Sequence, residues 1–229
     1  MNEIANKTTG INLPTSGFFI TGTDTDVGKT YAAACIAFTI KLNGDSIIPR
    51  KPVASGCIKQ PDGSYWVEDA ESLKNASQSN ESIDSICPFQ FEPAISPQTA
   101  ITQAGLTITV DDLINACQFN STDSYLVEGA GGFYSPLCSD GLNQDLASKL
   151  NLPIILVVKN RLGCINHALL TIEAIKNKGL HIHAIVLNFA NQEDFASDLK
   201  LWTEVPIWRL NYQADKSLQV ISELSQSHE

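Results

Sequence analysis

A loop between an apolar strand and a helix limits most strongly what this chain can fold into. The loop "GTDTDVGKT", residues 22–30, follows the apolar run "GFFIT" and precedes the helix-like stretch "YAAACIAFTIKL". A strand that passes through a tight loop into a helix begins a β-α-β unit, and such units build sheets of parallel strands. This stretch alone therefore predicts an α/β fold.

The rest of the chain repeats the alternation of short apolar runs and helical patterns. The predicted strands cover residues 17–22, 46–50, 123–128, 153–159, 181–188 and 205–210. The predicted helices cover residues 28–42, 66–76, 97–104, 109–118, 142–150, 165–178 and 192–203, and residues 77–98 form the least regular segment. Because the strands are almost continuously apolar, helices are expected on both faces. The fold class is therefore a three-layer sandwich with a mostly parallel central sheet.

Composition narrows the class of protein further. A chain of 229 residues predicts one domain over residues 17–229, preceded by a loose polar extension over residues 1–16. The net charge of -10 excludes a basic face for nucleic acid or an anionic membrane. Apolar runs such as residues 153–158 are well short of the ~20 residues that span a bilayer. Six cysteines without a Cys-x-x-Cys pair argue against zinc or thioredoxin chemistry, and we expect a cytoplasmic protein.

The loop itself has the pattern of a phosphate-binding P-loop. In such a loop backbone N–H groups surround a phosphate, a lysine reaches the β- and γ-oxygens, and a hydroxyl holds Mg²⁺. Here those side chains belong to Lys29 and Thr30, with five rather than the usual four residues between the glycines. The alternative is a glycine-bounded turn that only caps the helix. The strand before the loop and the helix after it favour a P-loop NTPase-like fold that binds a nucleotide.

Two further motifs follow predicted strands. In "RKPVASG", residues 50–56, Lys51 ends a strand where side chains point into the site, and Ser55 begins a small turn. In "LVEGAGG", residues 126–132, Glu128 ends an apolar strand beside three glycines, as a second magnesium ligand does in P-loop enzymes. The alternatives are a solvated lysine at a strand end and an exposed glutamate in a tight turn.

Several acidic residues have roles that the pattern leaves open. Asp24 and Asp26 would repel a polyanion, so they either face away or help to place a metal ion or a cationic group of a co-substrate. Glu68, Asp69 and Glu71 begin a predicted helix, where acids ordinarily complement the helix dipole. The residues alone favour this ordinary role for all three.

A last motif, "RLGCINHALL", follows the strand at residues 153–159. Gly163 and the helix start after it form an anion-binding turn suited to a carboxylate. His167 has no paired acid nearby in sequence and is interpreted as structural.

Together these motifs resemble a known family. "GTDTDVGKT", "KPVASG", "VEGAGG" and "LGCINHALLT", in this order and at these separations, closely resemble the dethiobiotin synthetases, the penultimate enzymes of biotin synthesis. The resemblance runs from about residue 17 to about residue 210. It implies an ATP-dependent ligase that joins CO₂ or bicarbonate to 7,8-diaminopelargonate and closes the ring of dethiobiotin, releasing ADP and phosphate. It also implies Mg²⁺ as cofactor and a homodimer that shares its substrate site across the interface.

The resemblance assigns roles to individual residues. The implied nucleotide-binding residues are Asp26, Val27, Gly28, Lys29, Thr30, Asp69, Glu128, Gly129, Ala130, Gly131, Asn188 and Pro206. The implied substrate-binding residues are Thr25, Lys51, Ser55 and, from the neighbouring subunit, Gly163, Cys164, Ile165 and Asn166. Lys51 and Lys29 are implied to be catalytic, and Thr30, Asp69 and Glu128 to hold Mg²⁺. This reverses the interpretation of Asp69 as an ordinary helix-start acid.

Two departures from the family lie where the base of the nucleotide binds. Asn188 is followed by Phe189 rather than aspartate, and "VPIWRLN" lacks the acid that many members carry. Strict selectivity for ATP is therefore open.

Two other classes of protein share the loop. An amide-forming ligase of the cobyrinate-synthesis kind would carry a glutaminase domain, for which 229 residues leave no room. A partitioning or switch ATPase commonly has an additional lysine in the loop and a basic element, whereas this loop contains acids and the chain is acidic.

Overall fold

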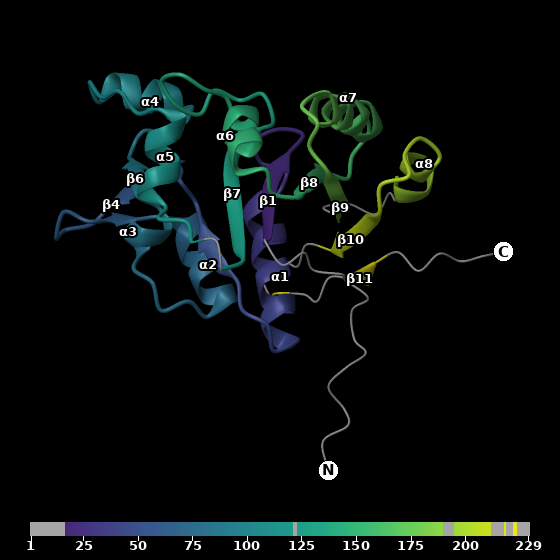
Figure 1. The fold of residues 1–229 in the computed structure, drawn as a ribbon, viewed down its shortest axis with the longest axis horizontal. Coiled ribbons are helices and arrows are strands. Elements are labelled where there is room, and N and C mark those ends of the chain that lie inside the picture. Colours follow the sequence, from purple (N-terminus) through teal and green to yellow (C-terminus); the bar gives the residue numbers. More distant parts are fainter. Residues whose placement is uncertain (1–16, 121–122, 190–194, 212–217, 219–221, 224–229) are drawn as a thin grey trace, which may run out of the picture.

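A computed structural model describes residues 17–120, 123–189, 195–211, 218 and 222–223 of the chain (Figure 1). The predicted extension over residues 1–16 lies outside the described residues. The strands are β1 (Gly17–Gly22), β2 (Ile48–Arg50), β3 (Val53–Ser55), β4 (Ile58–Lys59), β5 (Tyr65–Trp66), β6 (Phe89–Phe91), β7 (Tyr125–Gly132), β8 (Ile154–Lys159), β9 (Ile182–Phe189), β10 (Ile207–Asn211) and β11 (Ser222–Glu223). The helices are α1 (Lys29–Leu42), α2 (Glu68–Ser77), α3 (Ile83–Ile86), α4 (Pro97–Gln103), α5 (Val110–Ala116), α6 (Asn143–Leu150), α7 (Cys164–Asn177) and α8 (Ala196–Lys200).

The central sheet has the strand order β11-β10-β9-β8-β1-β7-β2. Every pairing in it is parallel except that of β10 with β11. The predicted mostly parallel sheet is therefore confirmed. β1 lies in the middle, between β7 and β8, so the loop that follows β1 opens at the centre of one sheet edge. The carboxyl ends of parallel strands at such a point are where α/β sheets bind ligands.

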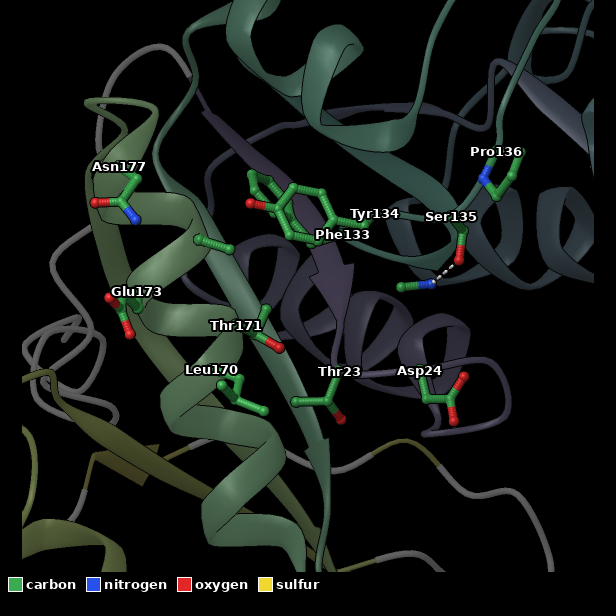
Figure 2. Close-up of a pocket in the computed structure, with 12 residues that line it drawn as sticks. Thr23, Asp24, Phe133, Tyr134, Ser135, Pro136, Leu170, Thr171, Glu173 and Asn177 are labelled. Atoms are coloured by element: carbon green, nitrogen blue, oxygen red, sulfur yellow. Dashed lines mark hydrogen bonds between the residues drawn. The ribbon is translucent and has the colours of Figure 1, made fainter.

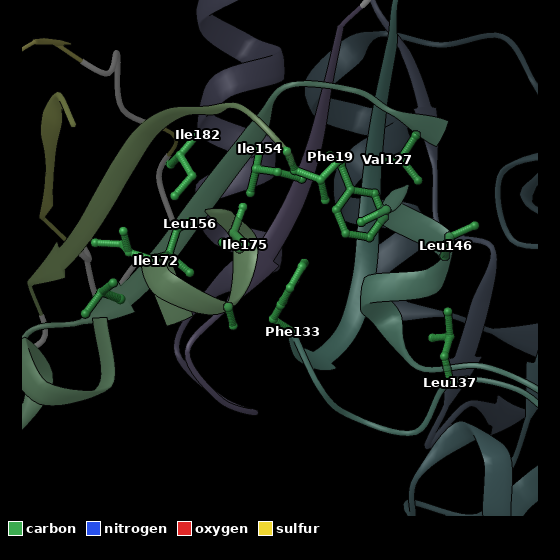
Figure 3. Close-up of a cluster of buried hydrophobic side chains, with 14 of the residues drawn as sticks. Phe19, Val127, Phe133, Leu137, Leu146, Ile154, Leu156, Ile172, Ile175 and Ile182 are labelled. Atoms are coloured by element: carbon green, nitrogen blue, oxygen red, sulfur yellow. The ribbon is translucent and has the colours of Figure 1, made fainter. Parts of the chain in front are cut away.

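The two faces of the sheet are covered by different helices, which makes three layers. Successive strand residues point to opposite faces. Phe18 therefore belongs to a core with α1 and α2, whereas Phe19 belongs to a core with α5, α6 and α7. Figure 3 shows part of this second core, in which Leu156 of the sheet lies near Ile175 of α7 and Phe19 of β1 lies near Ile154 of β8.

Local end signals define several helices as their residues predict. Thr109 caps α5, because its hydroxyl accepts from the Asp112 N–H while the Asp112 carboxylate accepts from the Thr109 N–H. α7 ends at Asn177, and Gly179 follows its C-cap residue with a φ of 71°, which suits a helix stop. No helix within the described ranges is long and apolar enough to cross a membrane.

The structure differs from the predicted elements around residues 50–56 and 77–98. β2 ends at Arg50, and the chain continues past Pro52 into β3, which pairs in parallel with β6 as a separate small sheet. The segment expected to be least regular thus contains α3 and β6. The pairing of β3 with β6 joins residues far apart in sequence, so no local pattern signals it. The last helix, predicted over residues 192–203, is described over Ala196–Lys200, with residues 190–194 outside the described part.

Candidate active site

The loop after β1 is closed tightly on itself. Gly28 has φ 90°, and a Cβ at this position would lie 2.0 Å from Nδ2 of Asn188, which donates to the carbonyl of Val27 at 3.1 Å. Asp26 also has a positive φ, of 56°. Asp24 turns its carboxylate onto the loop, where Oδ1 accepts from the Thr25 N–H at 2.8 Å. Glycine at residue 28 is therefore required both by the backbone angle and by the approach of Asn188.

A cavity of about 330 Å³ opens beside this loop, at the carboxyl ends of β1, β2 and β7. Its lining includes most of the residues predicted to bind nucleotide and substrate. The lining residues are Thr25, Asp26, Gly28, Lys29, Thr30, Lys51, Ala54, Ser55, Asp69, Glu128, Ala130 and Gly131. The strand order brings three sequence motifs and the start of α2 to one place.

Lys51 lies between two carboxylates at the floor of the cavity. Its Nζ is 2.7 Å from Oδ2 of Asp69 and 2.7 Å from Oε1 of Glu128, and it also donates to the carbonyl of Gly129 at 3.2 Å. The hydroxyl of Thr30 lies 2.7 Å from Oδ1 of Asp69 and 2.9 Å from Oε1 of Glu128. Lys51 is therefore not a solvated lysine, and Asp69 does more than begin a helix.

Burial and charge act together on these groups. Burial by itself lowers the pKa of Lys51, but the charges of Asp69 and Glu128 outweigh burial and raise that pKa above its usual value. The ammonium of Lys51 in turn lowers the pKa of Asp69. The pKa of Glu128 is raised, because the desolvation of this fully buried carboxyl exceeds the attraction of Lys51. Lys51 and Glu128 are buried and Asp69 is partly exposed, so the cluster is a largely buried ion-pair network in which loss of one member would leave a charge without its partner.

Thr30, Asp69 and Glu128 fit a magnesium ion. They offer oxygen ligands only, which Mg²⁺ prefers, and Oε2 of Glu128 is buried without a hydrogen-bond partner among the described residues. Within the described ranges, no group of three or more His, Cys, Asp or Glu side chains forms an all-protein metal site. Mg²⁺ in phosphoryl-transfer sites is held by one or two carboxylates and by substrate phosphates, so two acids and a hydroxyl suffice.

Lys29 is bent back onto its own loop, with Nζ donating to the carbonyl of Asp24 at 3.0 Å. Burial, followed by the nearby positive charge of Lys51, lowers the pKa of Lys29 to about 8. An anion in the cavity would offset both effects, because it would add negative charge to that of Glu128, Asp69 and Asp26, which already act on Lys29.

Of the remaining predicted nucleotide and substrate residues, Ser55 lines the cavity, whereas Asn188 and Pro206 do not. Ser55 donates its hydroxyl proton to the carbonyl of Ile95 at 2.6 Å. Asn188 is buried, and its Oδ1 has no hydrogen-bond partner in the part of the chain that is described. Pro206 lies just before β10 and does not line the cavity. Ala130 and Gly131 line the cavity, and Asn143 of α6 bonds to the backbone of Ala130 and Gly132. The sequence patterns did not single out Asn143, because it is an ordinary residue for a helix start.

Gly163 to Asn166 are not brought to this cavity within one chain. Gly163 and Asn166 are exposed, at the start of α7. The same helix lines a second cavity of about 660 Å³, which Thr23 and Asp24 border from the loop side (Figure 2). Leu170 faces this hollow and is 60% exposed.

Curated relatives of this chain share one name. The ATP-dependent dethiobiotin synthetase BioD of Ruthia magnifica subsp. Calyptogena magnifica is 41% identical over 174 residues, 75% of this chain and 79% of that protein. The protein of that name from Marinobacter nauticus is 41% identical over 179 residues, 77% of this chain and 76% of its own length. That from Xanthomonas campestris pv. campestris (strain 8004) is 35% identical over 217 residues, 89% of this chain and 96% of its own length.

Two solved structures resemble the fold at low identity. The ParA family ATPase from Chlorobium tepidum TLS has a TM-score of 0.52 and 17% identity, covering 88% of this chain and 87% of that one. The Pyrococcus furiosus cell division ATPase MinD has a TM-score of 0.50 and 14% identity, covering 86% of this chain and 84% of that one. They support the P-loop NTPase-like fold only.

A family model described as an AAA domain matches residues 16–225, nearly the whole chain. The predicted resemblance is thereby confirmed over the length that carries the loop, Lys51 and the two carboxylates. With 35 to 41% identity to these relatives over most of its length, the chain belongs to the dethiobiotin synthetase family.

Proposed function

We propose that this protein is an ATP-dependent dethiobiotin synthetase, which joins CO₂ to 7,8-diaminopelargonate and closes the cyclic urea of dethiobiotin. The observation that carries the proposal is the meeting of Lys29, Lys51, Asp69 and Glu128 in one cavity beside the P-loop. The shared name of its relatives supports the same activity. One domain spanning residues 17–229 is proposed to carry out the reaction. The cytoplasmic location of the protein stays a prediction.

Carbamate formation and phosphoryl transfer depend mainly on how the protein positions the substrate and ATP. One amine of the substrate captures CO₂ as a carbamate, and the γ-phosphoryl group of ATP transfers to a carbamate oxygen, releasing ADP. Phosphoryl transfer needs in-line positioning and compensation of negative charge, which Lys29 and Lys51 supply from two sides of the cavity. Thr25 and Ser55, which also line the cavity, are proposed to bind the diamine.

Thr30, Asp69 and Glu128 are proposed to hold Mg²⁺, which when bound supplies positive charge beside the β- and γ-phosphate oxygens. Positive charge held there would compensate the two carboxylate partners of Lys51, so that Lys51 would be available to bind the carbamate. The second amine attacks the carbon of the carbamic–phosphoric anhydride, phosphate leaves, and the ring closes. This last step is intramolecular, so holding the substrate in place lowers its barrier.

The magnesium assignment predicts different effects for neighbouring acids. Asp69→Asn and Glu128→Gln should each raise the Mg²⁺ concentration needed for half-maximal activity by about tenfold or more, since each removes one charged ligand. Glu71→Gln, on the same helix as Asp69 but outside the cavity lining, should leave that concentration unchanged. Magnesium titrations at fixed ATP measure the three values, and coinciding curves would reject the assignment.

The base of ATP is proposed to lie against Asn188 and Pro206. Asn188 Nδ2 is engaged by Val27, whereas its Oδ1 is buried with no partner among the described residues, which suits the amino group of adenine. The backbone from Asp26 to Thr30 and the turn from Gly129 to Gly131 are proposed to surround the phosphates.

The substrate carboxylate is proposed to bind a second copy of the chain. The amino end of α7, outside the cavity that holds Lys51, carries Gly163, Cys164, Ile165 and Asn166. Gly163 and Asn166 are exposed and could serve a neighbouring subunit directly, whereas Cys164 is buried and Ile165 half-buried, so these two would contribute backbone N–H groups. A two-fold dimer would build two equivalent sites, each with Lys51 from one chain and Asn166 from the other.

Mixing two inactive variants tests this shared site. Lys51→Gln and the bulky Asn166→Trp should each be nearly inactive as pure dimers. After unfolding, equal mixing and refolding, about half of the dimers should be heterodimers with one intact site, restoring roughly a quarter of wild-type activity. If native mass spectrometry confirms exchange and the mixture stays inactive, the whole site lies within one chain.

Product analysis tests the function itself. Incubation with diaminopelargonate, bicarbonate, Mg²⁺ and ATP should give the mass of the cyclic urea, and ATP turnover should require both the diamine and bicarbonate. ATP turnover that proceeds at full rate without the diamine would instead indicate a switch or partitioning ATPase, which shares the fold.

A further inference from the structure

The end of β7 leaves the ladder of the central sheet beside the active site. Ile20 of β1 pairs with Glu128, and the next paired residues are Gly22 and Gly132, so the register shifts between them. Gly129 to Gly131 lie opposite Thr21 alone, so β7 has two extra residues here and forms a bulge.

The side-chain amide of Asn143 forms hydrogen bonds with the backbone of this bulge. Its Oδ1 accepts from the Ala130 N–H at 3.2 Å, and its Nδ2 donates to the carbonyls of Ala130 and Gly132, the latter at 2.9 Å. Asn143 is fully buried, and a Cβ on Gly129 would come within 2.6 Å of its Oδ1. Only an amide offers one acceptor and two donors at this spacing.

Asn143 is not occupied in capping its own helix. The Leu142 N–H at the start of α6 donates to the Asp145 carboxylate at 2.8 Å, so Asp145 closes the helix start. The Asn143 amide is therefore directed across to β7, and its three bonds all serve the bulge.

The bulge is part of the reaction cavity. Ala130 and Gly131 line it, and the carbonyl of Gly129 accepts from Lys51 Nζ at 3.2 Å. The position of that carbonyl depends on the bulge, because Gly129 is bonded directly to the clamped Ala130. Asn143 thus holds Ala130, the residue next to Gly129, whose carbonyl accepts from Lys51.

We propose that Asn143 is a positioning residue: it clamps the Gly129–Gly132 bulge so that the Gly129 carbonyl and the cavity wall hold Lys51 in its reactive place. The inference rests on the proposed function for Lys51, but the clamp itself concerns only the backbone of the bulge. Asn143 does not line the cavity and acts only through the bulge, which is also proposed to border the phosphates, so its loss should lower kcat more than it weakens ATP binding.

The test compares Asn143→Ala with Asn115→Ala, the same change at an exposed residue of α5. Alanine leaves space for water to solvate the bulge, which favours folding of the variant. For Asn143→Ala we expect kcat to fall about tenfold or more, as misplacement of a reacting group does, while the Kd for ATP stays within about threefold. The amide of Ala130 should exchange its hydrogen about tenfold faster or more than in the unchanged protein. Asn115→Ala should alter none of these values.

Several results would overturn the proposal. One is a kcat within twofold of the unchanged protein. Another is a fall in kcat matched by an equal loss of ATP affinity, which would make Asn143 a residue of general stability. If Asn143→Ala does not fold, hydrogen exchange in the unchanged protein decides: a protected Ala130 amide supports the clamp, and one exchanging like an exposed amide rejects it. If the unchanged protein gives no cyclic-urea product, the proposed function is rejected. Hydrogen exchange at Ala130 would still test the clamp, because it does not depend on the reaction.

Discussion

Replacing Lys51 by glutamine is expected to lower turnover by about two orders of magnitude or more, the scale of losing one electrostatic contact in a transition state. Glutamine keeps most of the length and polarity but removes the charge that faces the carbamate and the transferring phosphoryl group. The ammonium of Lys51 is buried and lies 2.7 Å from both Asp69 and Glu128, whereas Lys29, the other lysine of the cavity, donates to the carbonyl of Asp24.

The same substitution should change stability in a way that depends on Mg²⁺. Removing one partner of a buried ion pair typically costs about 3–5 kcal/mol, since the other charge stays buried without compensation. Without Mg²⁺, Lys51→Gln should therefore unfold at lower denaturant concentration. With Mg²⁺ and ATP much of the loss should return, because a second cation would compensate Asp69 and Glu128.

Lys59→Gln is the control, as Lys59 is an exposed lysine on the β4–β5 hairpin. Steady-state kinetics and denaturant titrations with and without Mg²⁺ measure both effects. Activity of Lys51→Gln within a few-fold of the unchanged protein would show that Lys51 has no part in the reaction.

Adding one methyl group at Gly28 is expected to weaken ATP binding by about two orders of magnitude. A non-glycine residue at φ 90° stores roughly 1–3 kcal/mol of strain. The new Cβ would also lie 2.0 Å from Asn188 Nδ2, which must move and leave the Val27 carbonyl unpaired, at about 1–3 kcal/mol. The loop of the free variant can relieve both costs by leaving this conformation, and ATP binding then has to restore it. A combined cost near 3 kcal/mol at that step corresponds to about a hundredfold in Kd.

Two comparisons separate the strain from the collision. Gly63 also has a positive φ, of 91°, but a Cβ there would meet no atom within 4 Å. Gly63→Ala therefore adds strain without a collision, outside the loop, and should leave the Kd for ATP unchanged. Gly28→Ala combined with Asn188→Ala removes the collision, so its Kd relative to Asn188→Ala alone should reflect strain only. Calorimetric titration with ATP and Mg²⁺ gives these values, and a Gly28→Ala Kd within threefold of the unchanged protein would contradict the expected crowding.

The sequence by itself determined the features that depend on neighbouring residues. The loop around Lys29 predicts the strand before it and the helix after it, because its glycines permit the tight turn and its lysine and threonine are the residues that bind phosphate and Mg²⁺. The parallel sheet follows from the alternation of apolar and helical segments. Lys51 and Glu128 could be expected near the loop, since the carboxyl ends of parallel strands meet at one edge of a sheet. Family resemblance, rather than pattern, supplied the role of Asp69.

Only the tertiary structure decided which of these residues touch. The strand order inserts β7 between β1 and β2, so Lys51 meets Glu128, 77 residues later in the chain. The pairing of β3 with β6 and the clamp of Asn143 on the β7 bulge likewise join segments through contacts that leave no periodic trace in sequence. Local patterns record the conformation that each segment prefers, whereas the contacts between segments are set by packing the whole chain around its two cores.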